Sequence, residues 1–191
     1  MSKKLSKPDF TSKGYLEDCI LQRESVRSFK SKKIEEEKLS RILWSAQGKK
    51  GKKRTVPSAG AKYPLELYIV IKDEGLFQYQ IKDHSLKLLN KEELCDKIAK
   101  ASWNQIFICE APLILIICAN FSRTTNRYGQ RGVRYVHMEV GHCAQNVWLE
   151  VISLGLSSVP IGAFKDEQMK LLLELSEDID PLYVLPIGYA R

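Results

Sequence analysis

Residues 113–119 (LILIICA) form the longest apolar run in the chain. A run of this length suits a strand and falls far short of the roughly 20 residues that a membrane-spanning helix needs. Because successive side chains of a strand point to opposite faces, a run that is apolar at every position must be covered on both faces. The run therefore predicts a central strand with other elements packed on both sides of its sheet.

The longest helical pattern covers residues 131–154 and supplies one covering layer. Its apolar residues recur three or four positions apart, as on one face of a helix; they are Val136, Val140, Cys143, Val147 and Val151. Gly155 follows at a position suited to ending the helix. Shorter helical patterns predict helices over residues 14–23, 34–47, 91–101 and 166–174.

Three further strands are predicted. Residues 65–71 (LELYIVI) are rich in strand-forming residues. Residues 77–81 alternate and are expected to pair with them as a hairpin across residues 73–75. Residues 183–187 give a last strand. These elements predict an α+β fold with a central mixed β-sheet flanked by helices.

Length and composition fit one folded domain. The chain has 191 residues, of which 44% are hydrophobic. We expect a flexible basic N-terminus over residues 1–12 and a single domain over residues 13–191. The first residues (MSKKL) lack the apolar stretch of a signal peptide, and no membrane span is predicted, so we expect a cytoplasmic protein. The five cysteines include no Cys-x-x-Cys pair, which argues against a disulfide framework and a zinc site; no metal site is predicted.

The net charge is +7. Positive residues gather in the first 33 positions and in residues 49–54 (KKGKKR). Such a surplus suits an anionic partner, which could be a phosphorylated cofactor, an acidic substrate or a nucleic acid. For residues 49–54 the competing interpretation is a solvated loop.

Three clusters carry candidate chemistry. Residues 23–27 (RESVR) place two guanidinium groups around a hydroxyl, a set that suits phosphate. Residues 56–64 (VPSAGAKYP) and 154–164 (LGLSSVPIGAF) combine prolines with small residues, which allow a ligand to approach the backbone. A solvated surface pair and ordinary connecting loops are the competing interpretations.

In this order, the three clusters resemble the FMN site of the nitroreductase family. Residues 23–29 (RESVRSF) are similar to its N-terminal Arg-x-Ser-x-Arg/Lys-x-Phe signature. Residues 43–68, which include RTVPSAGAKYPLELY, resemble the SagB/ThcOx-type dehydrogenase branch more than the main nitroreductases. Residues 135–149 (YVHMEVGHCAQNVWL) and 154–164 also resemble that branch. The resemblance implies a nitroreductase-like fold and an obligate homodimer with FMN at the subunit interface.

The resemblance also implies roles for single residues. Arg23, Ser25 and Arg27 would hold the phosphate, the ribityl chain and the pyrimidine edge of FMN. A second group would come from the other subunit and close over the same flavin: Pro57, Ser58, Ala59 and Gly60.

The remaining cofactor contacts implied by the resemblance lie later in the chain. Asn104 would lie near a pyrimidine oxygen. Pro160, Ile161 and Gly162 would pass the isoalloxazine ring, where a main-chain N–H could steady the reduced flavin. Arg191 is expected to supply the basic phosphate contact that many relatives place in a C-terminal tail.

The catalytic residues stay unassigned. Lys62 could attract an anionic substrate, and Tyr63 could donate a proton beside the expected flavin. Ala61 replaces an asparagine typical of the main nitroreductases, which argues against transferring their substrate preference.

Three functions remain open. The first is an FMN-dependent oxidoreductase that takes electrons from NADH or NADPH and passes them to a small nitroaromatic or quinone. The sequence has no GxGxxG motif, so the nicotinamide would dock transiently. The second is a SagB-type dehydrogenase that oxidises azoline rings in modified peptides. The third, of another class, is a nucleic-acid-binding protein that uses residues 49–54.

Overall fold

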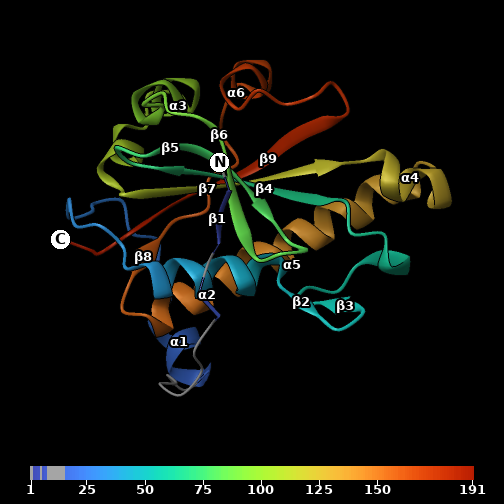
Figure 1. Cartoon of the computed structure of the whole chain (residues 1–191), viewed down its shortest axis with the longest axis horizontal. Helices are drawn as coiled ribbons and strands as arrows, with labels where there is room; N and C mark the ends of the chain where they lie inside the picture. Colours follow the sequence, from blue (N-terminus) through green and yellow to red (C-terminus); the bar gives the residue numbers. More distant parts are fainter. Residues whose placement is uncertain (1, 5, 8–15) are drawn as a thin grey trace.

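The computed structural model describes residues 2–4, 6–7 and 16–191. A seven-stranded sheet runs through the molecule in the order β1-β6-β5-β4-β7-β9-β8 (Figure 1). Its strands are β1 (Ser2–Lys4), β4 (Leu65–Ile71), β5 (Gly75–Gln80), β6 (Ser85–Asn90), β7 (Leu113–Asn120), β8 (Ser157–Ser158) and β9 (Ile179–Gly188). A separate small hairpin joins β2 (Lys49–Lys50) to β3 (Lys53–Arg54).

Helices cover both faces of this sheet. They are α1 (Leu16–Gln22), α2 (Glu36–Gln47), α3 (Cys95–Ala101), α4 (Ser122–Tyr128), α5 (Arg131–Ser153) and α6 (Asp166–Leu172), with short 3₁₀ turns η1 (Ala59–Ala61) and η2 (Ile106–Glu110). Figure 1 shows α3 and α6 on one side of the sheet and α2 and α5 on the other. Within the described ranges, no helix is both long and apolar enough to cross a membrane.

Strand β7 confirms the prediction made from the apolar run. All eight of its residues are buried. Leu115 and Ile117 pack in the core that includes α2 and α5, whereas Ile114 and Ile116 pack in the core that includes α3 and α6. The alternation of side chains along a strand therefore places β7 between two hydrophobic layers.

The end of α5 also agrees with the sequence. Gly155 has φ +68° and donates its N–H to the Ile152 carbonyl (2.9 Å). The Leu156 N–H reaches back to the Val151 carbonyl (2.9 Å). These two hydrogen bonds end the helix at a residue in the left-handed conformation, which glycine adopts without steric cost.

The expected α+β class is confirmed, but the sheet is not mixed. Every pairing between its named strands in the described ranges is antiparallel; parallel contact is limited to an isolated bridge between Ser25 and Ser158. Chain direction cannot be read from apolar periodicity, because parallel and antiparallel strands share the same side-chain alternation.

Several boundaries differ from the expectations. Strand β6 and helix α4 were missed, because SLKLLN alternates only partly and SRTTNRY carries no apolar stripe. Helix α3 begins at Cys95 instead of residue 91. Ser2 and Lys4 pair with β6, unlike the flexible terminus that was expected. Residue 1, residue 5 and residues 8–15 lie outside the described residues, as do the first two positions of the helix predicted over 14–23.

Candidate functional site

Residues 23–29 lie along the ends of β8 and β9 and are held there by main-chain contacts. The Val26 N–H donates to the Ser158 carbonyl (3.2 Å), and Phe29 forms an isolated bridge with Ala190. Phe29 is fully buried. Because the bonds involve the backbone, the positions of the flanking arginines are fixed by the sheet and not by their own side chains.

The side chains of this segment differ in exposure. Arg23 is half-buried, and its guanidinium lies 4.3 Å from the centre of the Trp148 ring. Ser25 and Arg27 are exposed. The Trp148 Nε1 is buried and has no hydrogen-bond partner among the described residues. Stacking on an aromatic ring orients a guanidinium while leaving its N–H donors available.

Arg191 lies beside the same segment. Its N–H donates to the Ser28 carbonyl (3.3 Å), and its Nη2 lies 3.8 Å from Glu110 Oε2. The same Glu110 oxygen accepts the Phe29 N–H (3.1 Å). Glu110 therefore ties the C-terminal arginine to residues 23–29, although these positions are far apart in sequence.

Residues 160–162 present one candidate main-chain donor. The N–H and carbonyl of Ile161 are both paired with Val184 (2.8 and 2.9 Å), and Pro160 has no N–H. Gly162 is exposed, and an added Cβ there would meet only Tyr183 Cε2, at 3.9 Å. Gly162 is therefore the residue of the three whose backbone a ligand can approach.

Asn104 is brought to the same end of the molecule. It is exposed and has φ +59°. The neighbouring Gln105 donates from Nε2 to the Ala163 carbonyl (3.3 Å), which joins this loop to the segment that follows Gly162. We call residues 23–29, 102–105, 157–163 and 188–191 together the arginine region.

Residues 57–63, here the 57–63 loop, form a separate group. Ser58 Oγ accepts the Tyr63 N–H (2.8 Å), and the Ser58 carbonyl accepts the Ala61 N–H (3.0 Å). Gly60 has φ +58°, and an added Cβ would lie 2.6 Å from the Tyr128 hydroxyl of α4. Pro57 and Gly60 are exposed, Ser58 and Ala59 are half-buried, and Lys62 is exposed.

A buried polar network lies beneath the 57–63 loop. Glu139 of α5 is 2% exposed, and its Oε1 lacks a hydrogen-bond partner among the described residues. Burial raises the pKa of Glu139 to about 7, although the nearby Ser58, Arg54 and Gln47 favour its charged form. A carboxyl group with this pKa changes its protonation near neutral pH.

Arg54 links this network to the loop. Its guanidinium lies 4.5 Å from the centre of the Tyr63 ring and donates from Nη1 to Gln47 Oε1 (3.0 Å). Its main-chain N–H donates to the Tyr63 hydroxyl (3.3 Å). Burial lowers the pKa of Arg54, since desolvation disfavours its charge. Tyr63, with φ +49°, is therefore held by the residue that precedes the loop.

Arg54 and Glu139 were not among the candidate cofactor-binding or catalytic residues, although Arg54 ends the basic run 49–54. Glu139 had a recognisable signal, because it interrupts the apolar face of α5 between Val136 and Val140. A charged residue at a buried helical position needs partners. Arg54 had no comparable signal, since it ends a run of exposed lysines.

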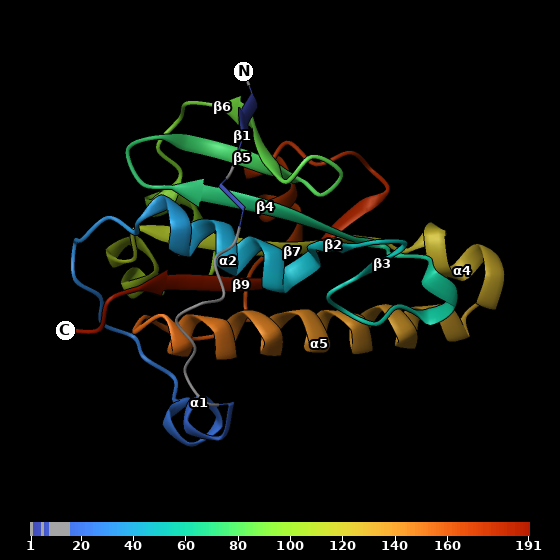
Figure 2. The same ribbon diagram turned by 60° about the horizontal axis from the view of Figure 1, so that its bottom comes forward.

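The two groups lie near opposite ends of α5. Figure 2 shows β9 and the C-terminus towards the end of α5 that leads to β8, whereas the segment between β3 and β4 lies by α4. The structure thus brings one set of sequence candidates together: Arg23, Ser25, Arg27, Asn104, Pro160, Ile161, Gly162 and Arg191. It leaves Pro57, Ser58, Ala59, Gly60, Lys62 and Tyr63 apart from them within one chain.

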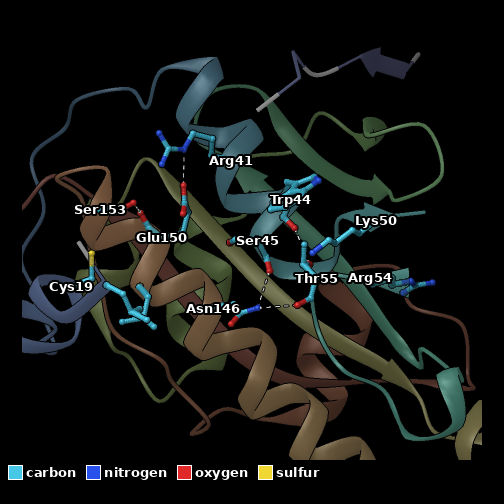
Figure 3. A pocket seen from close by; sticks show the side chains of 12 residues that line it. Cys19, Arg41, Trp44, Ser45, Lys50, Arg54, Thr55, Asn146, Glu150 and Ser153 are labelled. Atoms are coloured by element: carbon cyan, nitrogen blue, oxygen red, sulfur yellow. Dashed lines mark hydrogen bonds and ion pairs between the residues drawn. The ribbon is translucent and has the colours of Figure 1, made fainter. Parts of the chain in front are cut away.

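A cavity of about 520 Å³ lies between α1, α2, α5 and the β2–β3 hairpin (Figure 3). An ion pair between Arg41 Nε and Glu150 Oε1 (2.6 Å) closes one side, and Asn146 Nδ2 donates to the Ser45 and Thr55 carbonyls on another. None of the candidate cofactor-binding or catalytic residues lines this cavity, although Lys50 and Arg54 of the basic run 49–54 do.

The arginine region suits a phosphorylated, flat group such as FMN. Arg27 and Arg191 are exposed cations on adjoining segments, and Arg23 is oriented by Trp148. Gly162 leaves room for a ring to approach the backbone. Charged donors for a phosphate and an open backbone for a planar ring are the two features that binding such a cofactor requires.

Comparisons with known proteins identify the family of the chain. The profile of the Nitroreductase family matches residues 20–189. A Methanocaldococcus jannaschii protein that carries a nitroreductase name is 46% identical over 180 residues, covering 91% of this chain and 90% of its own. A crystal structure of a Ralstonia eutropha protein, also titled a nitroreductase, superposes with a TM-score of 0.89 at 28% identity, covering 100% of this chain and 90% of that one.

More distant relatives carry names of two kinds. The FMN reductase [NAD(P)H] of Bacillus subtilis is 25% identical over 86% of this chain and 61% of its own length. The microcin B17-processing protein McbC of Escherichia coli is 23% identical over 71% of this chain and 54% of its own. This relative agrees with the resemblance to the SagB/ThcOx-type branch. The family profile spans most of the chain, and the chain belongs to the nitroreductase family of oxidoreductases.

Proposed function

We propose that the protein is an FMN-dependent oxidoreductase that works as a homodimer with its flavin at the subunit interface. The observation that carries this proposal is the separation of the two candidate groups along α5. One chain supplies the arginine region as a half-site without a cover. A second copy would bring its own 57–63 loop to that half-site, which explains why both groups carry ligand-binding features.

In this proposal the arginine region binds and orients the cofactor. Arg27 and Arg191 pair with the phosphate, and Arg23 is directed towards the ribityl chain by its stacking on Trp148. The Gly162 N–H faces the ring, since the Ile161 N–H is already taken by Val184. The bound flavin would supply the hydride and electron chemistry, and the protein supplies binding and electrostatics.

The 57–63 loop would cover the partner subunit's flavin and exclude water. Its exposed Lys62 draws an anionic substrate towards the ring. Tyr63 is held in place because its hydroxyl accepts the Arg54 main-chain N–H, and a hydroxyl that accepts one hydrogen bond can still donate its own proton. Neither residue needs to act as a nucleophile.

The proposed reaction moves electrons from NADH or NADPH to a small nitroaromatic or quinone. The name of the B. subtilis relative, an FMN reductase using NAD(P)H, supports this donor. Both substrates would use the same open site in turn, with no separate dinucleotide domain.

The visible absorption spectrum of the purified protein tests the proposal. The expected result is a yellow protein whose flavin bands bleach on addition of NADH or NADPH and recover on addition of a quinone. A protein that stays colourless when FMN is added would contradict flavin binding, and flavin bands that never bleach would contradict the nicotinamide donor.

A second candidate is an azoline dehydrogenase that acts on modified peptides. It is favoured by the residues 43–68 that resemble the SagB/ThcOx branch and by the microcin-processing relative. Oxidation of a thiazoline-containing peptide without added NADH or NADPH would favour this function over the first.

A further inference from the structure

A second cavity, of about 470 Å³, lies between the β2–β3 hairpin and the turn that joins β5 to β6. Five of its eight lining residues are cations and none is acidic; the lining is Lys49, Gly51, Lys52, Lys53, Arg54, Tyr63, Ile81 and Lys82. We call it the basic cavity. Walls that carry one sign of charge focus the field on whatever enters.

The four lysines of the basic cavity make no ion pair within the described part of the chain, whereas Arg54 has Glu139 nearby. None of the ion pairs found there involves Lys49, Lys52, Lys53 or Lys82.

A cavity of about 430 Å³ beside β4 shows the contrast. It also holds lysines, but Lys33 pairs with Glu74 and Lys3 pairs with Glu36 inside it. Lysine content alone therefore does not make a cavity positive in this molecule, and the basic cavity differs because the ion pairs found in the described residues leave its four lysines unpaired.

Arg54 gives the basic cavity a fixed donor. Its guanidinium is held between the Tyr63 ring and Gln47 Oε1, so it is oriented before a ligand arrives. Lys49 and Lys53 lie on the two strands of the β2–β3 hairpin, and Lys52 lies in its two-residue turn, where Gly51 has φ +60°. One oriented guanidinium surrounded by exposed ammonium groups is a set that suits a phosphate dianion.

Tyr63 connects the basic cavity to the proposed active site. It lines the cavity and ends the 57–63 loop, which the proposed function places over a flavin. A long ligand with its reactive ring at the flavin could extend its far end into the cavity. NADPH has this form, and it differs from NADH by a phosphate on the adenosine ribose.

We infer that the basic cavity binds the 2′-phosphate of NADPH and makes NADPH the preferred electron donor. The choice of NADPH as the ligand rests on the proposed function. The affinity of the cavity for a phosphate can nevertheless be measured without turnover. The inference gives residues 49–54 a role in binding NADPH that does not involve nucleic acid.

The test compares the double variant Lys52→Gln/Lys53→Gln with the control Lys87→Gln/Lys91→Gln. The control removes the same charge from exposed lysines outside the cavity. The ratio of kcat/KM for NADPH to that for NADH should favour NADPH in the unmodified protein. It should fall roughly ten-fold in the first variant, since two contacts to a phosphate are lost, and stay constant in the control.

A binding titration separates this inference from the proposed function. Adenosine 2′,5′-bisphosphate should bind the flavin-loaded protein more tightly than AMP, and the Lys52/Lys53 variant should lose that difference. If neither nicotinamide bleaches the flavin but the bisphosphate is still preferred, the proposed function fails and the phosphate site stands. Equal binding of both nucleotides would overturn the inference, as would an unchanged donor ratio. Displacement of the bisphosphate by a short DNA duplex at physiological salt would also overturn it, in favour of a nucleic-acid surface.

Discussion

The arginine region and the 57–63 loop are held in place by different means. Main-chain hydrogen bonds and bridges to β8 and β9 fix the arginine region. The 57–63 loop rests on side chains instead, through Ser58, Arg54 and the buried Glu139. Backbone contacts do not titrate, whereas a carboxyl group with a pKa of about 7 does.

This difference suggests how one chain could contribute two unlike parts to the proposed sites of a dimer. The arginine region is suited to binding, because main-chain contacts hold residues 23–29 against β8 and the end of the chain. The 57–63 loop, which the proposed dimer would use as a cover, lies above a buried carboxyl group that titrates near neutral pH. We therefore expect pH and side-chain substitutions to affect the loop more than the arginine region.

Glu139→Gln should give the largest effect. The pKa of Glu139 is raised from 4.5 in the unfolded chain to about 7. Its contribution to stability is therefore fully present below pH 4.5 and is lost as the pH rises through 7. A shift of this size corresponds to roughly 3 kcal/mol. In the unmodified protein, urea unfolding should give a lower free energy of unfolding at pH 8.5 than at pH 5. In Glu139→Gln this difference should be much smaller.

The matched control is Glu167→Gln, which removes an exposed carboxylate of α6. It should keep the pH dependence of the unmodified protein. An identical pH dependence in Glu139→Gln would show that the loop is not held by a titrating group.

Arg27→Ala comes next and addresses the arginine region. Loss of a charge-assisted contact to phosphate should weaken FMN binding by roughly 1.5–3 kcal/mol, without pH dependence near neutrality. Arg23→Ala should act similarly, and Arg191→Ala less, because Arg191 already lies near Glu110. Fluorescence titration with FMN measures the affinity, with Arg134→Ala of α5 as control. Unchanged affinity in both Arg23→Ala and Arg27→Ala would show that the phosphate lies elsewhere.

Ser58→Ala should have a smaller effect. It removes the acceptor of the Tyr63 N–H, which costs about 1 kcal/mol of loop stability, and should lower the flavin content of the dimer. Ser45→Ala is the matched control, since the Ser45 hydroxyl also makes a 2.8 Å bond to the main chain. A monomer that retains full flavin would contradict a site shared between subunits.

Gly162→Ala should keep the unfolding free energy within about 0.5 kcal/mol of that of the unmodified protein, because the added Cβ meets only Tyr183 Cε2 at 3.9 Å. It should nevertheless weaken FMN binding several-fold if the ring lies against this backbone. Gly60→Ala provides the contrast, since its φ of +58° and the Tyr128 hydroxyl at 2.6 Å make any side chain unfavourable. A loss of unfolding free energy in Gly162→Ala, with none in Gly60→Ala, would contradict this expectation.

Most of the fold could be predicted from hydrophobic periodicity. The two-sided burial of β7 and the Gly155 end of α5 followed directly from the residues. Strand β6 and helix α4 did not, because their residues become ordered through pairing and packing with distant segments. The antiparallel direction of the sheet depends on connections that periodicity does not encode.

The grouping of the candidate residues was only partly predictable. The ordered motifs supplied the candidate residues, but only the fold shows that Arg191 meets Ser28 and that Gln105 meets Ala163. Arg54 was missed because its role comes from a stacking contact with Tyr63. The pKa of Glu139 depends on burial, which its sequence neighbours suggest but do not determine.

Subunit complementation tests the shared site most directly. Arg27→Ala impairs the arginine region and Ala59→Trp obstructs the 57–63 loop, so each homodimer should bind flavin weakly. In a heterodimer, one site would combine an intact arginine region with an intact loop from the other chain. Random reassortment of the two variants should therefore restore about a quarter of the sites, measured as bound flavin per subunit. Flavin binding that stays at the level of the separate variants, in a mixture shown to contain heterodimers, would contradict a site built from two chains.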